Sequence, residues 1–205
     1  MSRESWDAAY ARNALAWRGT TNFSPKPAIK KGSRVLELGV GNGKNLSALF
    51  GKGWHLYAVD FSPEAVRQSY EMCRKRGEHC FVSMQDVRRL LFADSFFDAV
   101  ICFHVIGHLR KEERAKAVSE IRRVLKKNGL LFLRVFGEGD FRKGKGVKRS
   151  DCFVRKGIPT HYFSEKEVTS LFKDWKRVSL SSERWTVSYE GKTLPREQIH
   201  AVFRK

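Results

Sequence analysis

The sequence lacks three features that would each indicate a class of protein. No apolar run approaches the roughly 18 to 20 residues that cross a bilayer, and the opening stretch, MSRESWDAAYARN, is too charged and polar for a secretory signal. The cysteines at 73, 80, 102 and 152 are scattered and form no C-x-x-C pair. We therefore expect no membrane association, no metal site and no disulfide framework, and we expect a cytoplasmic protein with reduced thiols.

Acidic residues are also scarce. The chain has 22 Asp and Glu against 40 Lys and Arg, which gives a net charge of +18 over 205 residues. This balance favours polyanionic partners, of which nucleic acid is the commonest, although a generally basic, well-solvated surface would give the same composition. The length suits one well-buried α/β domain and is short for two.

Strand-like and helix-like segments alternate along the chain. Apolar runs predict strands at 34–39, 54–60, 79–86, 96–106, 130–136, 175–182 and 199–205. Helical periodicity and caps predict helices at 4–17, 44–51, 62–77, 110–129 and 164–174. The alternation predicts a single doubly wound, Rossmann-like α/β domain over 1–205, with a mostly parallel sheet and helices on both faces. Within it, 1–30 holds the N-terminal helix and a linker, and 137–163 is an irregular basic flap.

Capping residues mark several helix ends. Ser62 is placed as an N-cap and Gly77 as the end of the same helix. Ser164 and Glu167 have the spacing of a capping box. The longest helix is expected to stop at Asn128–Gly129, because an Asn-Gly pair is a common helix terminator.

A glycine hinge joins the first strand to the helix after it, in the stretch VLELGVGNGKNL. Gly39, Gly41 and Gly43 let the backbone turn tightly and approach a ligand, at the strand end where doubly wound sheets bind ligands. A dinucleotide fingerprint needs G-x-G-x-x-G or G-x-G-x-x-A, whereas here Lys44 takes the sixth position. The spacing therefore argues against NAD and leaves S-adenosylmethionine, or a tight turn that holds nothing.

Three acids follow three consecutive strands at the same edge. Glu37 lies near the end of a buried strand, where an unpaired carboxylate is costly, so it favours a ligand with an ammonium group over a pyrophosphate. Asp60 ends the second strand, where a carboxylate can accept from ribose hydroxyls. Asp86 ends the third strand and is placed to accept a hydrogen bond from an adenine amine.

Four stretches carry a resemblance to a known family: VLELGVGNGKN, AVDFS, QDVRRLLFADSFFDAVICFHVIGHL and EIRRVLKKNGLLFLRVF. In order and spacing they resemble the motifs of class I S-adenosylmethionine-dependent methyltransferases of type 11, over residues 33–136. A looser likeness points to the branch that methylates wobble uridine in tRNA. The resemblance implies a seven-stranded sheet with an antiparallel last strand, and S-adenosylmethionine as the cofactor.

The resemblance also implies roles for the motif residues. The implied cofactor-binding set is Tyr10, Glu37, Gly39, Gly41, Asn42, Gly43, Asp60, Phe61, Asp86, Val87 and Phe103. Glu37 and the glycine loop would hold the methionine part, Asp60 the ribose, and Asp86 with the Val87 amide the adenine. Phe103 would lie beside the transferable methyl group. Tyr10 belongs to an aromatic N-terminal helix that would fold over the cofactor as a lid.

Methyl transfer mainly requires close alignment of donor and acceptor, and a base is needed only when the acceptor must lose a proton early. His104 and His108, after the fourth strand, are the candidate catalytic residues, and local backbone bonding or packing is the alternative role for each. The N/D-P-P-Y/F motif that clamps an adenine or cytosine amino group is missing, since CFHV stands in its place. Methylation of exocyclic amines by that type of site is therefore not expected.

The basic flap is expected to rise over the site, because the fifth strand ends at its edge. Its candidate substrate residues are Arg142, Lys145, Lys148, Arg149, His161 and Tyr162. Cations interleaved with aromatic rings suit a phosphate-bearing acceptor, including RNA, whose bases can stack on rings. Three alternatives stay open: a small-molecule methyltransferase with a merely basic surface, a non-catalytic RNA-binding module, and a nicotinamide oxidoreductase, which Glu37 and Lys44 disfavour.

Overall fold

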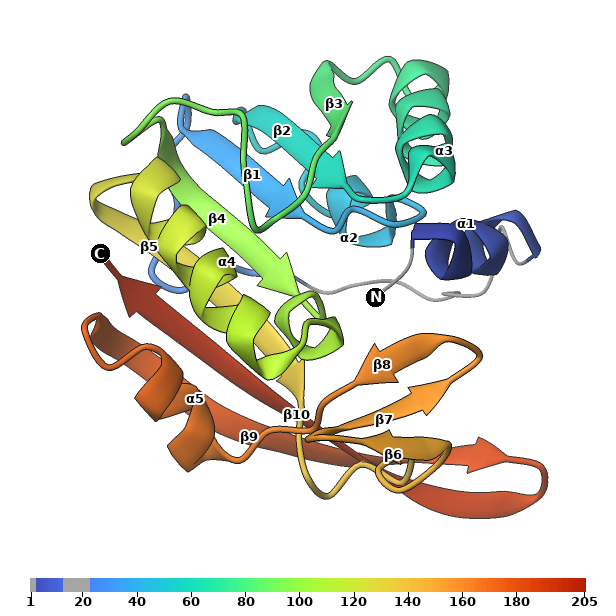
Figure 1. Cartoon of the computed structure of the whole chain (residues 1–205). Coiled ribbons are helices and arrows are strands. Elements are labelled where there is room, and N and C mark those ends of the chain that lie inside the picture. Colours follow the sequence, from blue (N-terminus) through green and yellow to red (C-terminus); the bar gives the residue numbers. More distant parts are fainter. Residues whose placement is uncertain (1–2, 13–22) are drawn as a thin grey trace.

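A seven-stranded sheet forms the centre of the computed structural model, which describes residues 3–12 and 23–205 (Figure 1). Its strands are β1 Arg34–Leu38, β2 His55–Asp60, β3 Cys80–Met84, β4 Phe97–Phe103, β5 Leu125–Phe136, β9 Lys176–Tyr189 and β10 Lys192–Arg204. The order is β3-β2-β1-β4-β5-β10-β9. The first five strands are parallel, and β10 runs antiparallel between β5 and β9. The predicted fold class is confirmed.

The last two strands form a much longer hairpin than predicted. Pairing runs from Tyr189↔Lys192 to Lys176↔Arg204, whereas the predicted strands cover only 175–182 and 199–205. The turn at Glu190–Gly191 has φ angles of 50° and 72°, and two positive φ values match the twist of a two-residue hairpin. The hairpin extends beyond the predicted strands because residues 183–188 and 192–196 pair in the sheet although they are mostly exposed or half-buried, so their polar character does not mark a loop.

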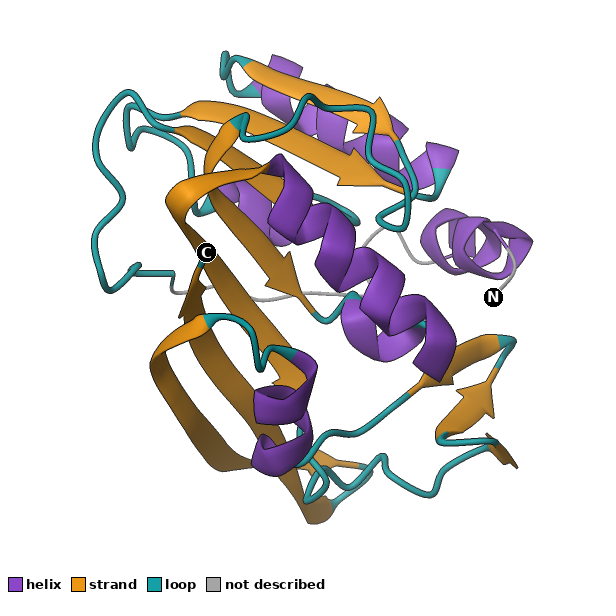
Figure 2. Cartoon of the chain, turned by 60° about the vertical axis from the view of Figure 1, so that its left-hand side comes forward, coloured by secondary structure: helices purple, strands orange, loops and turns teal. Residues whose placement is uncertain are grey.

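Helices cover both faces of the sheet (Figure 2). On one face lie α4 Lys111–Val124 and α5 Glu165–Leu171, and on the other lie α2 Lys44–Ser47 and α3 Pro63–Lys75. Strand β4 contributes Val100 to the hydrophobic core beneath α4 and α5 and Ile101 to the core beneath α2 and α3. It is therefore buried on both faces, as its apolar sequence indicates. A buried central strand fixes the position of the residues that follow it.

Two predicted helix ends are confirmed and a third is wrong. Ser62 caps α3 by accepting from the Ala65 amide, and Ser164 caps α5 by accepting from the Glu167 amide. Helix α4, however, ends at Val124 instead of Gly129. The amide of Phe96 donates to the Val124 carbonyl at 2.8 Å, which satisfies the helix end and lets the chain continue as strand.

The segment 137–163 contains a second, three-stranded sheet, so its prediction as irregular was wrong. The strands are β6 Val147–Arg149, β7 Cys152–Arg155 and β8 Ile158–Thr160, in sequence order and antiparallel. A short 3-10 helix, η1 Ile106–His108, packs against β8. This small sheet lies beside the carboxyl end of β4 and the β9–β10 hairpin (Figure 1).

The N-terminal helix, α1 Arg3–Arg12, lies against α3. The Ser62 hydroxyl bonds to the Asp7 carboxylate, and the Gln68 amide donates to the Tyr10 carbonyl at 3.3 Å. The predicted continuation to residue 17 lies outside the described residues. No helix in the described parts of the chain is both long and apolar enough to cross a membrane.

Candidate functional site

A cavity of about 800 Å³ opens at the carboxyl ends of the central strands. Its glycine-loop half is lined by Trp6, Tyr10, Gly39, Gly41, Asn42, Asp60, Phe61, Asp86, Val87 and Phe103. Its cationic half is lined by Arg134, Arg142, Lys145, Arg155, Lys156 and Arg196, together with the aromatic rings of Phe136, Phe153, Tyr162 and Trp185. The volume falls within the usual range of about 300–1,000 Å³ for small-molecule and cofactor sites.

The glycine loop is shaped so that side chains would not fit. Gly39 and Gly41 have φ angles of 67° and 56°. A Cβ at Gly39 would lie 2.4 Å from Val105 Cγ2, and one at Gly41 would lie 2.9 Å from the Tyr10 hydroxyl. The Gly41 amide donates to the Asp60 carboxylate at 2.9 Å. Backbone is therefore exposed to the cavity from a loop that a carboxylate holds in place.

Glu37 lies beneath this loop and does not line the cavity. Its side chain is 1% exposed, and among the described residues neither carboxylate oxygen has a hydrogen-bond partner of good geometry. Burial raises the pKa of Glu37 well above its ordinary value, and the nearby Asn45 amide offsets this only in part. A buried carboxylate in this state either stays protonated or meets a positive group that reaches it through the loop.

The other two acids line the cavity directly. The two oxygens of Asp60 accept from the amides of Gly41 and Ser62, each at 2.9 Å, and burial raises the pKa of its carboxyl despite these bonds. Asp86 is more open. Burial acts to raise its pKa, but hydrogen bonds from the Arg88 side chain and amide hold that pKa below the ordinary value. Asp86 is therefore ionised and already bonded on one side.

Helix α1 covers the cavity on one side, where Trp6 and Tyr10 line it. The Trp6 ring meets the His108 ring edge-on at 4.9 Å between centroids and stacks on Tyr10 at 5.9 Å. At the small sheet, a Cβ at Gly157 would lie 2.5 Å from Ser5 Oγ, so α1 also touches the turn between β7 and β8. The helix thus spans the cavity from α3 to the small sheet.

His104 enters the cavity where the two halves meet. Its φ of 60° is unusual for a residue other than glycine, and its ring stacks on Phe136 at 4.1 Å between centroids. Burial lowers the pKa of His104 well below its ordinary value, and the nearby charges of Arg142 and Arg134 add to the effect. Its Nδ1 is buried and has no hydrogen-bond partner among the described residues. The imidazole is therefore neutral at pH 7, with one nitrogen unused.

His108 is neutral as well, and its tautomer is set by the backbone. Nδ1 lies 2.7 Å from the Pro159 carbonyl oxygen, and because a carbonyl only accepts, Nδ1 carries the proton. This leaves Nε2 as an acceptor. Burial lowers the pKa of His108 to about 4, with the Arg142 charge adding to the effect and the Pro159 bond opposing it.

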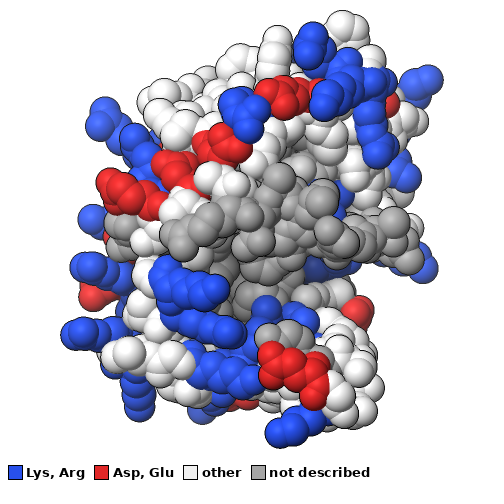
Figure 3. Space-filling model, turned by 90° about the vertical axis from the view of Figure 1, so that its right-hand side faces the viewer, with Lys and Arg blue, Asp and Glu red and all other residues white. Residues whose placement is uncertain are grey.

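The cationic half contains six Lys and Arg side chains, and no Asp or Glu lies among the described residues that line it. Phe136 is its central ring, since the Arg142 guanidinium lies 4.0 Å from its centroid and His104 stacks on it. Outside the cavity, Lys and Arg side chains gather over the small sheet and the hairpin (Figure 3), where Lys148 and Arg149 of β6 are exposed. Predicted residues Arg142, Lys145 and Tyr162 line the cavity, while Lys148 and Arg149 lie outside it.

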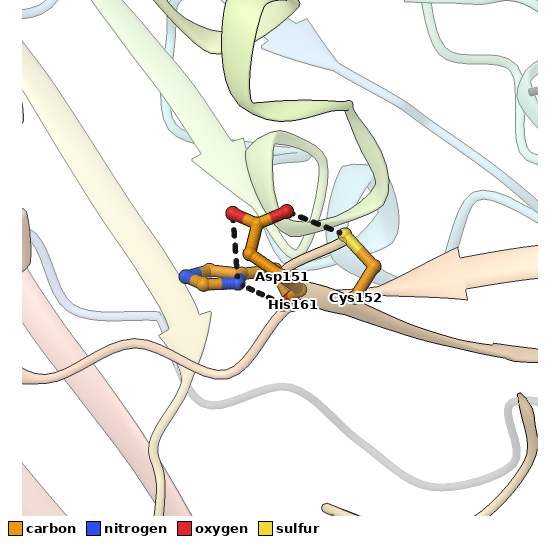
Figure 4. A group of neighbouring side chains, drawn as sticks. All are labelled: Asp151, Cys152 and His161. Atoms are coloured by element: carbon orange, nitrogen blue, oxygen red, sulfur yellow. Dashed lines mark hydrogen bonds and ion pairs between the residues drawn. The ribbon is translucent and has the colours of Figure 1, made fainter. Parts of the chain in front are cut away.

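His161 also lies outside the cavity, beside Asp151 and Cys152 (Figure 4). Its Nε2 bonds to Glu167 at 2.7 Å and its Nδ1 to the Asp151 carbonyl at 2.6 Å. Asp151, Cys152 and His161 are near enough to share a metal ion. However, the buried Arg114 guanidinium already pairs with Asp151 at 2.6 Å, and a second cation there would be repelled. We therefore interpret the cluster as structural and His161 as a member of it.

Several lining residues were missed from the sequence. Trp185, Arg196 and Gln198 come from the part of the β9–β10 hairpin that lies outside the predicted strands, and Arg134 lies within β5. A signal was present in β9, because Trp185, Val187 and Tyr189 alternate in the sequence with Thr186 and Ser188 in the period of two that a strand requires. Gly43, by contrast, was predicted to bind the cofactor but caps α2 and does not line the cavity.

Comparison with known proteins gives consistent results. Residues 36–133 match the family model described as "Methyltransferase domain". The tRNA N(3)-cytidine methyltransferase of Gallus gallus is 24% identical over 164 residues, which are 74% of this chain and 44% of that protein. Glycine/sarcosine N-methyltransferase of Parasynechococcus marenigrum is 32% identical over 154 residues, 70% of this chain and 54% of that protein. The chain thus spans about half the length of these curated relatives.

Among solved structures, an S-adenosylmethionine-dependent methyltransferase from Methanosarcina mazei has the same fold. It superposes with a TM-score of 0.76 at 21% sequence identity, over 90% of this chain and 99% of that one. At this identity the likeness concerns the fold alone.

Proposed function

Since this chain belongs to the class I S-adenosylmethionine-dependent methyltransferases, we propose that its cavity binds S-adenosylmethionine and directs the methyl group to an anionic acceptor. S-adenosylmethionine is the methyl donor of this family. The observation that carries the proposal is that one cavity joins a glycine-loop half to a half with six cations and no acid among its described lining residues. The first half suits the cofactor and the second suits the acceptor.

The residues of the glycine-loop half fit the cofactor. The bare backbone at Gly39 and Gly41 provides a cradle that any Cβ would fill. Glu37 supplies buried negative charge beneath it for an ammonium group, and Asp60 and Asp86 face the cavity as acceptors. Tyr10 and Trp6 would close over the bound cofactor. These roles follow the residues implied by the sequence, with Gly43 as the exception.

When bound, S-adenosylmethionine supplies an electrophilic methyl group, and the protein supplies alignment and a suitable electrostatic environment. His104 and His108 stay uncharged at neutral pH, so they do not oppose a bound sulfonium. Through Nε2, His108 can accept a proton or a hydrogen bond from an acceptor N–H or O–H. Phe136 and Tyr162 would fix the acceptor by contact with its flat surfaces.

RNA is the acceptor that we favour. The cations continue from the cavity to the exposed β6 residues Lys148 and Arg149, so a polyanionic backbone could follow them outward while one nucleotide enters the cavity. The two curated relatives act, by name, on tRNA and on glycine or sarcosine, and both kinds of acceptor carry negative charge. A small acceptor bearing phosphate or carboxylate is the alternative within the same reaction.

The test is transfer of labelled methyl from S-adenosylmethionine into fractionated total RNA, protein and small metabolites. We expect label in RNA, dependent on the intact protein and lost on Asp60→Ala. Label in the small-molecule fraction alone would replace RNA by the alternative acceptor. Strong RNA binding without any binding of S-adenosylhomocysteine would instead favour a non-catalytic RNA-binding module and contradict the proposal.

A further inference from the structure

One buried acid stands behind the cationic half and bonds two of its arginines. The Asp140 side chain is completely buried. Its Oδ1 accepts from Arg142 Nε at 2.8 Å, and its Oδ2 accepts from Arg142 Nη2 at 3.0 Å and from Arg196 Nε at 2.7 Å. Burial acts to raise the pKa of Asp140, but these hydrogen bonds hold it below the ordinary value. One carboxylate thus orients two guanidinium groups.

The backbone around Asp140 is fixed to the β9–β10 hairpin. The Gly137 amide donates to the Glu197 carbonyl at 2.9 Å, and the Phe141 amide donates to the Pro195 carbonyl at 2.9 Å. Between them, the Gly139 amide donates to the Glu197 carboxylate at 2.5 Å. Aromatic rings hold the guanidiniums from the side, with Phe136 at 4.0 Å from Arg142 and Trp185 at 5.4 Å from Arg196. The arrangement is therefore set before any ligand arrives.

Both arginines retain donors for a ligand. Arg142 uses Nε and Nη2 on Asp140, and Arg196 uses Nε. Among the described residues, Arg142 Nη1 and the two Nη atoms of Arg196 make no other hydrogen bond, and both side chains line the cavity. A guanidinium has five N–H donors in a fixed fork, so the pair presents several donors whose directions Asp140 determines.

We propose that Arg142 and Arg196, oriented by Asp140, form a phosphate-binding subsite that sets the specificity of this enzyme for its methyl acceptor. The inference rests on the proposed function only in assigning the phosphate to the acceptor. Paired guanidiniums match the oxygens of a phosphate group, and the two positive charges exceed the single negative charge of Asp140. Asp140 is a positioning residue, because it does not reach the ligand itself.

This subsite differs in a measurable way from general basicity. If net charge alone attracted the acceptor, Asp140→Asn would strengthen phosphate binding by removing a negative charge. If orientation matters, the same change weakens phosphate binding, because the amide offers one acceptor where the carboxylate offers two. Lysine substitutions make the same distinction: Arg142→Lys and Arg196→Lys keep the charge and lose the fork.

The experiment titrates inorganic phosphate, phosphoethanolamine and a single-stranded RNA hexamer, separately, into the full chain saturated with S-adenosylhomocysteine. The proteins are the wild type, Arg142→Lys, Arg196→Lys, Asp140→Asn and the matched control Arg177→Lys, whose exposed side chain on β9 lies outside the cavity. We expect at least tenfold weaker phosphate binding in the first three variants and wild-type binding in the control. In methyl transfer, KM for the acceptor should rise at least tenfold, with a smaller change in kcat.

Phosphate binding that is unchanged in both lysine variants would overturn the subsite, as would a wild type that binds none of the three probes. Preference for phosphoethanolamine or for the hexamer identifies whether the phosphate belongs to a small monoester or to RNA, and either supports the subsite. Titration of S-adenosylhomocysteine into the same samples distinguishes a failure of the subsite from a failure of the proposed function. If that titration is normal while phosphate binding does not depend on the arginines, only the subsite fails.

Discussion

Gly41 is the point at which the glycine loop, the Asp60 carboxylate and the Tyr10 hydroxyl converge. Each of the three has a local physical reason. Gly41 adopts a positive φ, and its amide donates to the Asp60 carboxylate. The absence of a side chain at Gly41 leaves space for the Tyr10 ring of α1. None of these residues would be placed this way by its own preference, because a buried carboxylate and a buried phenol are both costly unless paired.

The first prediction concerns this glycine. Gly41→Ala should weaken binding of S-adenosylhomocysteine at least tenfold, because its Cβ would lie 2.9 Å from the Tyr10 hydroxyl and would occupy the cradle. Gly51→Ala is the matched control, since Gly51 also has a positive φ, of 67°, but nothing lies within 4 Å of its Cβ position. Both variants should lose about 1–2 kcal/mol of unfolding free energy from backbone strain. Equal affinities in the two variants would contradict the cradle.

His108 gives a prediction in pH. Burial lowers its pKa from 6.5 to about 4, so between these values the unfolded chain binds more protons than the folded one. The stability contributed by neutral His108 is therefore complete above pH 6.5 and is lost as the pH falls toward 4. From pH 6.5 to about pH 5 the loss should be about 2 kcal/mol.

The measurement is urea unfolding of the wild type and His108→Gln at pH 7 and pH 5. The quantity to compare is the unfolding free energy of the wild type minus that of His108→Gln. This difference should be about 2 kcal/mol lower at pH 5 than at pH 7. His104 is present in both proteins, so its own titration largely cancels. A difference that does not vary with pH would show that His108 is not held neutral by burial.

At the scale of elements, the small sheet β6–β8 depends on one buried ion pair. Arg114 of α4 has a side chain that is 3% exposed, and it bonds Asp151 at 2.6 Å while its guanidinium packs on Phe163. Removing the cation leaves a partly buried acid unpaired. Arg114→Met should therefore lower the unfolding free energy by roughly 2–3 kcal/mol and make residues 137–163 more sensitive to protease.

Arg122→Met is the control on the same helix, because its bond to the Asp174 carbonyl is exposed, and it should change stability by about 0.5 kcal/mol or less. Affinity for S-adenosylhomocysteine should be normal in both variants, since neither residue lines the cavity. If Arg114→Met leaves the protease pattern unchanged, the cluster does not hold the small sheet in place.

The sequence predicted elements well where a strong local pattern was present. Strand β4 has an uninterrupted apolar run, α3 has Ser62 and Pro63 at its start, and the glycine loop has its spacing, so all three were placed correctly. The β9–β10 hairpin was not recognised, because an edge hairpin with one exposed face mixes polar with apolar residues. Arg196 and Asp140 were missed for a related reason: their pairing joins residues 56 positions apart, and no local pattern encodes it.

At the scale of the whole molecule, the cations behind the net charge of +18 are unevenly distributed. Cations line one half of the cavity and continue on β6, next to the cavity mouth. If RNA follows this route, its affinity must fall as the salt concentration rises. Each phosphate contact should contribute a loss of about 0.7 units in the logarithm of the affinity per tenfold increase in salt concentration. A basic surface that merely keeps the protein solvated predicts no such localisation.

Charge reversal tests the route. Lys148→Glu with Arg149→Glu should make the salt dependence of RNA affinity shallower by about 1.4 logarithmic units, because two phosphate contacts are lost. The control pair, Lys173→Glu with Lys176→Glu, lies before and at the start of β9, at the opposite end of the sheet. RNA affinities that respond equally to both pairs would mean that binding is spread over the surface.

The central claim is that the cavity is a methyl-donor site, and calorimetric titration with S-adenosylhomocysteine tests it most directly, with NAD as the competing ligand. We expect S-adenosylhomocysteine to bind the wild type at one site per chain, NAD to give no heat of binding, and Asp60→Ala to weaken the first interaction at least tenfold. Binding of NAD without binding of S-adenosylhomocysteine, or equal affinity in Asp60→Ala, would contradict the account.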